Sequence, residues 1–473
     1  PGLTGLAQVN GRNLLEWDER LKKDLSYQES FDVTFRKVDG LKKSFIIVFL
    51  NFLCNHEAIV EIIYSLEHLN LSKQKDIAKE IYNENATITT DYQTIYNSIL
   101  NGNIAIISDE EEVIICEVKN YPNRSIGEPE NEKVVRGSRD GFTENIATNI
   151  ALIRRRVKSG NLKVEKYEIG SISKTYVSLI YLDNFVDKKY LKRVKQSLDN
   201  INVEELTMTD KALEELMLKN QYTPYPLVKY TERPDTFCAH LYQGMFGILV
   251  DTSPSAMLGP ISIFDHMQHA EEFRQSILAG SYLRFIRFIG IILSFISVPL
   301  WYTLLQFSLP FTNMFGNLFN VEFNKSAIFL QIILMELGVE FIRMASIHTP
   351  SALSTSMGLI AGIVIGEIAI TIGVLSEQVV LLGAISAIGS YITPSYELSL
   401  ANKISKIFII TSIFFFNIYG LVVSFIILII YLCTLKSFGR SYLYPLIPFN
   451  GKDFLKQLFR FPYKKITKNK NKT

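Results

Sequence analysis

The sequence predicts a bilobed soluble domain of the α/β (α+β) class, followed by an all-α polytopic membrane domain. Apolar residues make up 48% of the 473 residues and the mean hydropathy is +0.16, yet charged residues still reach 20%. The apolar surplus is concentrated after Leu283, whereas residues 1–280 have the composition of an ordinary soluble protein. Residues 175–182 are rich in β-branched and aromatic side chains, as strands are, and helical patterns follow them.

Composition and spacing exclude several classes of protein. The net charge is only +2, so the chain carries no nucleic-acid-binding signature. The four cysteines are scattered without a CxxC pair, which indicates reduced structural thiols. His266 and His269 lie beside Glu271, but no other metal-type spacing supports a metal there, and we expect a polar surface near the membrane instead. We find no Ser-His-Asp constellation and expect no catalytic residues, no cofactor and no metal.

An internal repeat in the soluble half predicts two similar lobes. In both Gly102–Asp109 and Gly244–Asp251, a glycine precedes an apolar run and an aspartate follows it. The two glycines are 142 residues apart, and Asp39 and Asp183 are 144 apart. Two agreeing offsets favour two α/β lobes in tandem, with chance similarity as the alternative. Such lobes either form a cleft for a small ligand or act as a rigid assembly platform.

Local patterns predict individual elements within each lobe. Residues 104–107 and 113–118 are typical of two strands about a polar turn, and a second turn at 251–254 separates two short apolar runs. Helical patterns cover residues 187–199 and 208–218. The expected domains are lobe 1 at 36–126, a charged linker and helix at 127–165, lobe 2 at 166–280, the transmembrane domain at 281–435 and a basic tail at 436–473.

The linker between the lobes carries the densest charge pattern. An amphipathic helix follows it, with Ile146, Ile150, Ile153 and Val157 on one face. Arginine forks are suited to clasp carboxylates across a lobe or subunit boundary, whereas a solvated mixed-charge loop is the alternative. The candidate inter-lobe or inter-subunit coupling residues are Arg124, Glu128, Glu130, Arg136, Arg139, Glu144, Arg154, Arg155 and Arg156.

Five apolar stretches predict the membrane domain. Residues 288–309 and 407–435 contain no charge, and each is long enough to span a bilayer. Residues 354–376 also qualify, and residues 327–345 are apolar but contain charges. Residues 378–393 are short and fit a re-entrant segment better.

Charge placement predicts the orientation of the chain. The tail at 436–473 holds ten Lys or Arg and one acid, and the positive-inside rule places it in the cytoplasm. Arg284 and Arg287 flank the first span and place the soluble domain there too. Both ends inside require an even number of spans, so we expect about four spans plus a re-entrant segment. This puts Lys403 and Lys406 outside, against the rule.

Acidic residues within apolar stretches are costly and mark functional candidates. Glu336 and Glu340 share one helix face, and with Glu367 they form a candidate ion pathway. In the alternative, Glu340 pairs with Arg343 and the group only locks helices together. Small residues suited to close helix packing occur at Gly358, Ala361, Gly362 and Gly366.

Several long motifs resemble one family. Tyr121-Pro-Asn-Arg-Ser-Ile-Gly-Glu-Pro-Glu, the run Val-Val-Arg-Gly-Ser-Arg-Asp-Gly-Phe-Thr-Glu-Asn at 134–145 and Ser437-Phe-Gly-Arg-Ser-Tyr-Leu-Tyr-Pro-Leu-Ile-Pro448 closely resemble the A subunits of the spore germinant receptors, the GerA family. The match runs from about residue 38 to 462. It implies a non-enzymatic, multi-pass protein of the spore inner membrane that couples nutrient sensing to ion release and germination, as an oligomeric cation channel. It also implies partnership with a transporter-like B subunit and a lipoprotein C subunit, and homo-oligomers.

The first 35 residues resemble something else. Pro1-Gly-Leu-Thr-Gly-Leu-Ala-Gln-Val-Asn-Gly-Arg-Asn13, followed by Trp17-Asp-Glu-Arg20, is similar to the C-terminal end of bacterial sugar transferases. The resemblance implies a fusion or an artefact of gene joining, because the catalytic acids of those enzymes lie upstream of this motif. The competing functions are therefore a polyprenyl-phosphate sugar-phosphate transferase fusion and a non-conducting membrane scaffold.

Overall fold

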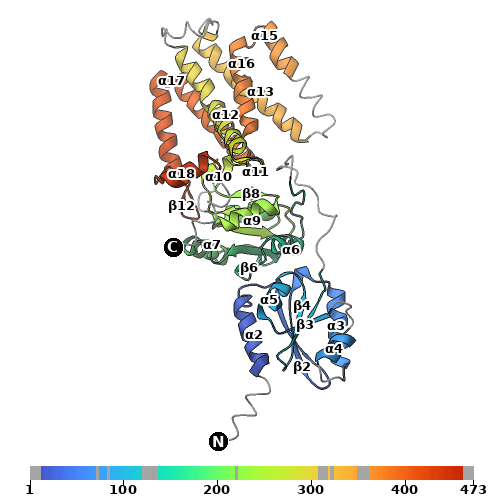
Figure 1. The fold of residues 1–473 in the computed structure, drawn as a ribbon. Helices are drawn as coiled ribbons and strands as arrows, with labels where there is room; N and C mark the ends of the chain where they lie inside the picture. The colour runs from blue at the N-terminus through green and yellow to red at the C-terminus, as the bar shows by residue number, and fades with distance from the viewer. Residues whose placement is uncertain are drawn as a thin grey trace. The chain divides into compact units, whose positions relative to one another are not determined.

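The protein divides into two compact units, which are described separately. The computed structural model describes residues 12–70, 74–81, 86–119, 132, 137–218, 222–306, 318–319, 324–348 and 362–461 (Figure 1). Unit 1 holds residues 1–219 and 228–261, and unit 2 holds residues 220–227 and 262–473.

Lobe 1 of unit 1 is an antiparallel sheet with helices on both faces. Its strands β1 (Val33–Asp39), β2 (Ser44–Leu50), β3 (Ala86–Thr89), β4 (Ile104–Ile107) and β5 (Val113–Cys116) have the order β1-β2-β4-β5-β3. Its helices are α2 (Arg12–Asp24), α3 (His56–His68), α4 (Gln74–Glu80) and α5 (Tyr92–Leu100), with the short η1 (Asn51–Leu53). Side chains alternate along each strand, so Ile104 and Ile106 pack with α3 and α4, whereas Ala105 and Ile107 pack with α2 and α5.

Lobe 2 of unit 1 repeats this plan. Its strands β6 (Leu162–Ile169), β7 (Thr175–Leu182), β8 (Lys229–Thr231), β9 (Phe246–Val250) and β10 (Ala256–Gly259) have the order β6-β7-β9-β10-β8. Its helices are α6 (Ile146–Arg156), α7 (Lys188–Asp199), α8 (Thr209–Met217) and α9 (Pro234–Tyr242). Helices α6 and α9 bury their apolar faces in one core with four of the strands. The predicted strand at 175–182, the strand pairs about both turns and the helices near 187–199 and 208–218 are all confirmed.

The two lobes share one strand order, which confirms the bilobed prediction. Gly102 and Gly244 occupy equivalent positions between a helix and the fourth strand, with φ +83° and +90°, where glycine avoids the strain of a Cβ. The assignment of Asp39 and Asp183 to equivalent positions of the repeat was wrong. Asp39 ends the first strand of lobe 1, whereas Asp183 follows the second strand of lobe 2, so their similar offset was coincidental.

Helix α2 is packed into lobe 1. Leu21 and Leu25 are at most 1% exposed and share a core with Val48 and Ile99. We therefore propose that lobe 1 begins at α2 rather than after residue 35. Residues 1–11 of the segment that resembles sugar transferases lie outside the described residues.

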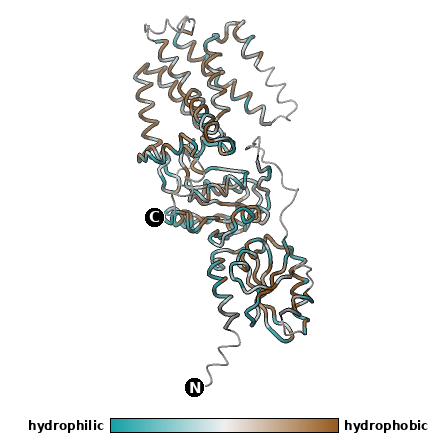
Figure 2. Tube along the Cα trace, viewed as in Figure 1, coloured by the Kyte–Doolittle hydropathy of each residue, from teal (hydrophilic) through white to brown (hydrophobic). Residues whose placement is uncertain are grey.

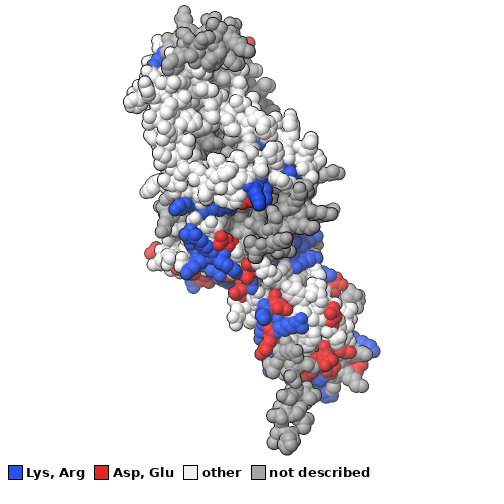
Figure 3. Space-filling model, turned by 60° about the vertical axis from the view of Figure 1, so that its left-hand side comes forward, with Lys and Arg blue, Asp and Glu red and all other residues white. Residues whose placement is uncertain are grey.

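The described part of unit 2 is mainly helical. Its elements are α10 (Ile263–Met267), α11 (Ala270–Arg274), α12 (Ile277–Leu304), α13 (Lys325–His348), the π-helix η3 (Val364–Ile368), α15 (Ala369–Thr371), α16 (Glu377–Ile392), α17 (Tyr396–Thr434), the hairpin of β11 (Lys436–Ser437) and β12 (Arg440–Ser441), and α18 (Gly451–Leu458). Helices α12 and α17 are long and apolar enough to cross a membrane (Figure 2). In the view of Figure 3, the surface over the long helices is nearly free of charge. A soluble domain followed by a helical domain is thus confirmed.

Helix α17 is broken into two halves that fold back on each other. Asn417 has φ +54° and ψ −136°, and asparagine tolerates a positive φ better than most residues. The hydroxyl of Tyr225 lies 2.9 Å from that of Ser405, and the ring of Tyr225 lies 6.3 Å from the ring of Tyr431. A continuous helix would separate Ser405 from Tyr431 by about 39 Å.

This helical hairpin corrects the expectation that residues 407–435 form one continuous span. A Cβ on Gly420 would come within 2.0 Å of the carbonyl oxygen of Ser412, so only glycine permits the two halves to approach this closely. The halves, at 396–416 and 418–434, each fall in the range of about 17–25 residues that crosses a bilayer.

Candidate functional site

Two ion pairs, one buried and one partly buried, join helices α13 and α17. The carboxylate of Glu336 lies 2.6 Å from the ammonium of Lys406, and both side chains are at most 7% exposed. One turn along, Lys403 donates to Glu340. Glu336 and Glu340 are four residues apart and Lys406 and Lys403 are three apart, so the two helices run antiparallel and present their charges in register. We call these residues, with Arg343 and Ser399, the charge ladder.

Arg343 forms the last step of the charge ladder. Its guanidinium donates to the hydroxyl of Ser399 at 2.9 Å and lies 4.5 Å from the centre of the Tyr396 ring. Among the described residues, the partner of Glu340 is therefore Lys403, and the alternative pairing of Glu340 with Arg343 was wrong. Lys403 and Lys406 are both buried among the helices, with 7% and 2% exposed.

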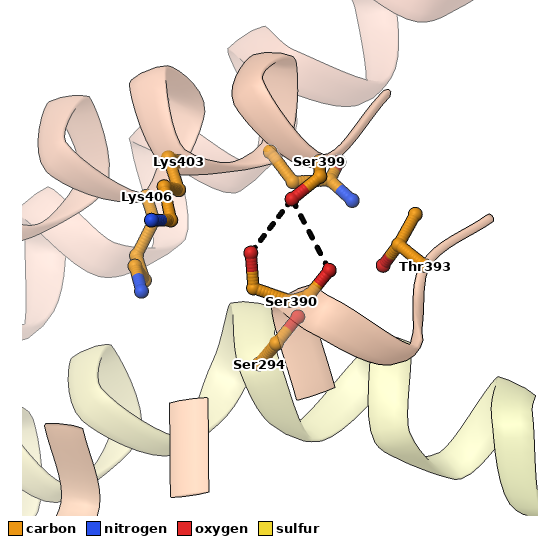
Figure 4. Close-up of a pocket in the computed structure, with 7 residues that line it drawn as sticks. Ser294, Ser390, Thr393, Ser399, Lys403 and Lys406 are labelled. Carbon is orange, nitrogen blue, oxygen red and sulfur yellow. Dashed lines mark hydrogen bonds between the residues drawn. The ribbon is translucent and has the colours of Figure 1, made fainter. Parts of the chain in front are cut away.

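A small polar cavity lies beside the charge ladder (Figure 4). Its volume is about 10 Å³, which is close to the room that one water molecule needs. The hydroxyls of Ser390 and Ser399 are 2.6 Å apart, and Lys406 donates to the hydroxyl of Ser386 at 2.5 Å. The cavity is lined by Ser294, Ser390, Thr393, Ser399, Asn402, Lys403 and Lys406. Polar groups thus surround both lysines beyond their carboxylate partners.

Glu367 is not brought to the charge ladder. It lies on the π-helix η3, its side chain is exposed, and it has no ion pair within the described part of the chain. Gly362 and Gly366 lie close by in the sequence, and no described atom lies within 4 Å of a Cβ added at either position. Gly358 and Ala361 of the predicted small-residue stripe lie outside the described residues. This face of the single chain is therefore uncovered by the residues described.

A second group of charges lies at the boundary between the lobes. Arg154 of α6 holds Asp32, which precedes β1, through two parallel hydrogen bonds of 2.7 and 2.9 Å. Both side chains are at most 2% exposed. Gly160 lies nearby and donates its amide to the hydroxyl of Tyr96 at 2.8 Å, and a Cβ at Gly160 would meet the carbonyl of Asp24 at 2.0 Å. The geometry joins the two lobes by a charged fork and a close backbone approach.

Arg156 holds the linker against α6. Its guanidinium donates to Asp140 and to the hydroxyl of Ser138, and also to the carbonyl of Leu152. Partial burial alone would raise the pKa of Asp140, but the hydrogen bond from Ser138 and the Arg156 guanidinium lower it below its ordinary range.

The remaining predicted coupling residues are either exposed or outside the described residues. Arg139, Glu144 and Arg155 are exposed, and the backbone carbonyl of Glu144 accepts a hydrogen bond of 2.7 Å from the amide of Thr252. The other four, Arg124, Glu128, Glu130 and Arg136, lie outside the described residues.

Glu132 is a linker acid that the sequence reasoning did not select. Its carboxylate accepts a hydrogen bond from Thr231 of β8, and its backbone carbonyl accepts one from Arg233 at 3.1 Å. Burial raises the pKa of Glu132, although Lys229, Thr231 and Arg233 oppose this shift. The linker is thus anchored to lobe 2 by partly buried polar contacts.

Comparison with known proteins gives the family. The profile described as "Bacillus/Clostridium GerA spore germination protein" matches residues 19–472, which is nearly the whole chain. The chain belongs to the GerA family. Membership of this family, together with the apolar helices α12 and α17, indicates a membrane-associated protein.

Named relatives of this GerA-family chain come from Bacillus subtilis (strain 168). Stage V sporulation protein AF is 41% identical over 95% of this chain and 92% of its own length. Spore germination protein A1 is 32% identical over 88% of this chain and 86% of its own length. Spore germination protein KA is 29% identical over 79% of this chain and 69% of its own length.

One solved structure also resembles the chain. It is the N-terminal domain of the A subunit of the Bacillus megaterium spore germinant receptor GerK3, with 24% identity and a TM-score of 0.39. The similarity covers 51% of this chain and 92% of that domain.

Sequence reasoning missed the partners of the charged residues it selected. Lys403, Lys406 and Asp32 were absent from the candidates, although each is a buried residue that forms an ion pair. A usable signal existed for the lysines, because two bases three residues apart in an apolar helix complement two acids four apart in another. No comparable signal exists for Asp32, which lies 122 residues from Arg154.

Proposed function

We propose that this chain is the A-type subunit of a nutrient germinant receptor in the spore inner membrane, and that it couples germinant sensing to ion release. The family match over residues 19–472 and the names of relatives such as spore germination protein A1 support this role. The partners are a transporter-like B subunit and a lipoprotein C subunit. The role is that of a receptor subunit and not of an enzyme.

The observation that carries the proposal is the charge ladder between α13 and α17. Moving a charge out of water and into an apolar helical bundle is costly, so charges that are buried there are expected to serve a purpose. We propose that Glu336 and Glu340 line the ion pathway and that Lys406 and Lys403 neutralise them in a closed state. Release of the lysines would expose two carboxylates that attract cations.

The exposed face at Glu367 supports a homo-oligomer. An exposed carboxylate on an apolar segment requires a polar partner or water within the membrane. The uncovered Gly362 and Gly366 permit close approach of another helix. We propose that copies of this chain associate through this face and that Glu367 lines the shared pore.

The lobes transmit the signal in this proposal. They lie on the cytoplasmic side, and the chain crosses the membrane several times. Arg154 and Asp32 make the two lobes move as one body, because separating them would leave a buried charge unpaired. The linker at 127–165 then relays motion through the exposed Arg139, Glu144 and Arg155 and through Arg124, Glu128, Glu130 and Arg136, which meet a neighbouring subunit.

Ion release from spores tests the conduction role. The double variant Glu336→Gln/Glu340→Gln removes both carboxylates and keeps the side-chain shape, so we expect potassium release after nutrient addition to fall about tenfold or more in spores that hold a normal level of the protein. Glu397→Gln, which removes an exposed carboxylate at the start of α17, is the matched control and should release potassium normally. Unchanged release from the double variant, with normal protein levels, would favour a non-conducting scaffold.

A role in sporulation is the second candidate. The identity to stage V sporulation protein AF is 41%, against 32% and 29% to spore germination proteins A1 and KA. A receptor subunit predicts that deletion leaves spore yield intact and abolishes the response to specific nutrients. A sporulation component predicts a loss of spore yield or of nutrient-independent steps. The sugar-transferase resemblance of residues 1–35 stays a prediction, and a transferase fusion would require a catalytic acidic pair encoded upstream.

A further inference from the structure

Three arginines converge where α11, α12 and α18 meet in unit 2. Arg284, which is 2% exposed, donates to the carboxylate of Glu272 at 2.7 Å and to the carbonyl of Lys456 at 2.9 Å. Arg287 forms an ion pair with the same carboxylate. Arg460 donates to the carbonyl of Phe273 at 2.7 Å, next to Glu272. We call Arg284, Arg287 and Arg460 the arginine cluster.

The arginine cluster is built by close backbone approach. A Cβ on Gly280 would meet the carbonyl of Glu272 at 2.4 Å and the side chain of Arg460 at 2.9 Å. The amide of Arg460 also donates to the hydroxyl of Ser281 at 3.1 Å. The glycine therefore lets the chain after α18 lie directly against the start of α12 and brings its arginine to the other two.

The positive charge of the cluster exceeds its negative charge. Glu272, 0% exposed, is the carboxylate within ion-pair distance among the described residues, and it faces Arg284 and Arg287. Each arginine also has a buried nitrogen without a hydrogen-bond partner among the described residues. These nitrogens are Nη2 of Arg284, Nε of Arg287 and Nη1 of Arg460. Buried polar groups are nearly always satisfied, so an unfilled set of this kind points to a missing anion.

The surroundings indicate where that anion comes from. Arg284 and Arg287 lie just before the uncharged, apolar part of α12, a position that suits the surface of a membrane. The same turns expose Tyr282 and Phe285, which are 62% and 55% exposed, and α18 is followed by Phe459, which is 49% exposed. Guanidinium groups surrounded by exposed apolar side chains suit a phospholipid. Its phosphate would meet the guanidinium groups, and its acyl chains would meet the apolar side chains.

We propose that the arginine cluster binds a phosphate group, supplied by an anionic phospholipid of the membrane that α12 crosses. Guanidinium forks match phosphate oxygens in geometry. Arg287 is the most accessible of the paired arginines, at 15% exposure, and moves outward to admit the phosphate. The proposal requires that α12 lies in a membrane. It does not require that the chain conducts ions, so ion-release results do not bear on it.

Thermal unfolding of the purified full-length chain in neutral detergent tests the proposal. Phosphatidylglycerol should raise Tm of the wild type by about 5 °C at saturation, whereas phosphatidylcholine should not. Arg287→Gln and Arg460→Gln should each remove most of this shift, and Arg287→Lys, which keeps the charge but loses the fork, should remove part of it. Lys452→Gln, an exposed base on α18, is the matched control and should keep the full shift.

Two further arms decide the source and the site. If inorganic phosphate raises Tm of the wild type by as much as phosphatidylglycerol does, the arginine cluster still binds phosphate, but the assignment of that phosphate to a lipid is overturned. Glu272→Gln removes the competing carboxylate and should increase the response to phosphatidylglycerol. If the wild type, Arg287→Gln and Arg460→Gln respond equally to phosphatidylglycerol, or if the wild type does not respond, the arginine cluster is only a structural clamp.

Discussion

Glu336 and Lys406 form a salt bridge of 2.6 Å between two apolar helices, with side chains that are 7% and 2% exposed. The lysine also donates to the hydroxyl of Ser386, so its charge is held by two partners from different helices. An ion pair buried in this way contributes little net stability compared with apolar packing, but its members are costly to separate. That asymmetry means that the charge ladder resists any change that separates one carboxylate from its lysine.

Removing one partner of this salt bridge should lower the free energy of unfolding more than removing both partners. Lys406→Met leaves the Glu336 carboxylate buried without its partner, and we expect a loss of about 3–5 kcal/mol in the free energy of unfolding. Glu336→Gln/Lys406→Met removes both charges and should lie within about 1–2 kcal/mol of the wild type. Unfolding of the full chain in lipid nanodiscs measures both. A double variant that is as unstable as Lys406→Met would contradict this expectation, because removing the unpaired carboxylate should restore stability.

The fork between Arg154 and Asp32 should depend on its shape as well as its charge. Arg154→Lys keeps the charge but loses one of the two parallel hydrogen bonds, so we expect a loss of about 1–3 kcal/mol. Hydrogen exchange of the Gly160 amide, which bonds to Tyr96, reports the loosening of the lobe boundary. Arg155→Lys changes the exposed neighbour on α6 and serves as the control. Unaltered protection of Gly160 in Arg154→Lys would contradict this role for the fork.

The helical hairpin should fail when Gly420 gains a side chain. Gly420→Ala places a Cβ within 2.0 Å of a backbone carbonyl that cannot move freely, so we expect a loss of about 2 kcal/mol or more. Gly451→Ala, where the nearest atom would lie at an ordinary 3.5 Å, is the matched control. Tm of the full chain in detergent distinguishes them. A Gly420→Ala variant as stable as Gly451→Ala would argue against the fold-back at Asn417.

Acid should weaken the linker through Asp140. The pKa of this carboxyl is lower in the folded protein than in the unfolded chain, where it is about 3.9. Its contribution is therefore present above pH 4 and is lost as the pH falls through the folded pKa. Denaturant unfolding between pH 2.5 and 7 should show this loss in the wild type and not in Asp140→Asn. A parallel pH dependence of the two proteins would exclude Asp140 as its source.

Glu132 should make the protein less stable as the pH rises, which is the opposite of the effect of Asp140. Burial raises the pKa of this carboxyl above the value of about 4.3 in an unfolded chain. Its contribution is fully present below pH 4 and is lost as the pH rises through the folded pKa. Glu132→Gln imitates the protonated form, so it should be more stable than the wild type at pH 7 and equal to it at pH 4. A variant less stable than the wild type at pH 7 would show that the charged form is the favoured one.

Some of these features were accessible from local patterns. The strand at 175–182, the turns after β4 and β9 and the helix at 146–156 follow from side-chain alternation, turn residues and helical periodicity. The carboxylates of Glu336 and Glu340 stood out because charge is rare in an apolar stretch. Arg154 and Arg156 were selected for their density of charge, and both form ion pairs.

The sequence by itself determined the order of a soluble α/β part and an apolar helical part, because composition and periodicity are local properties of the chain. Only the tertiary structure decided that Lys406 meets Glu336, that Asp32 meets Arg154 and that α17 turns back at Asn417. Those outcomes depend on which surfaces pack together over long separations in the chain. A partner that is chosen by packing leaves no mark in the spacing of nearby residues.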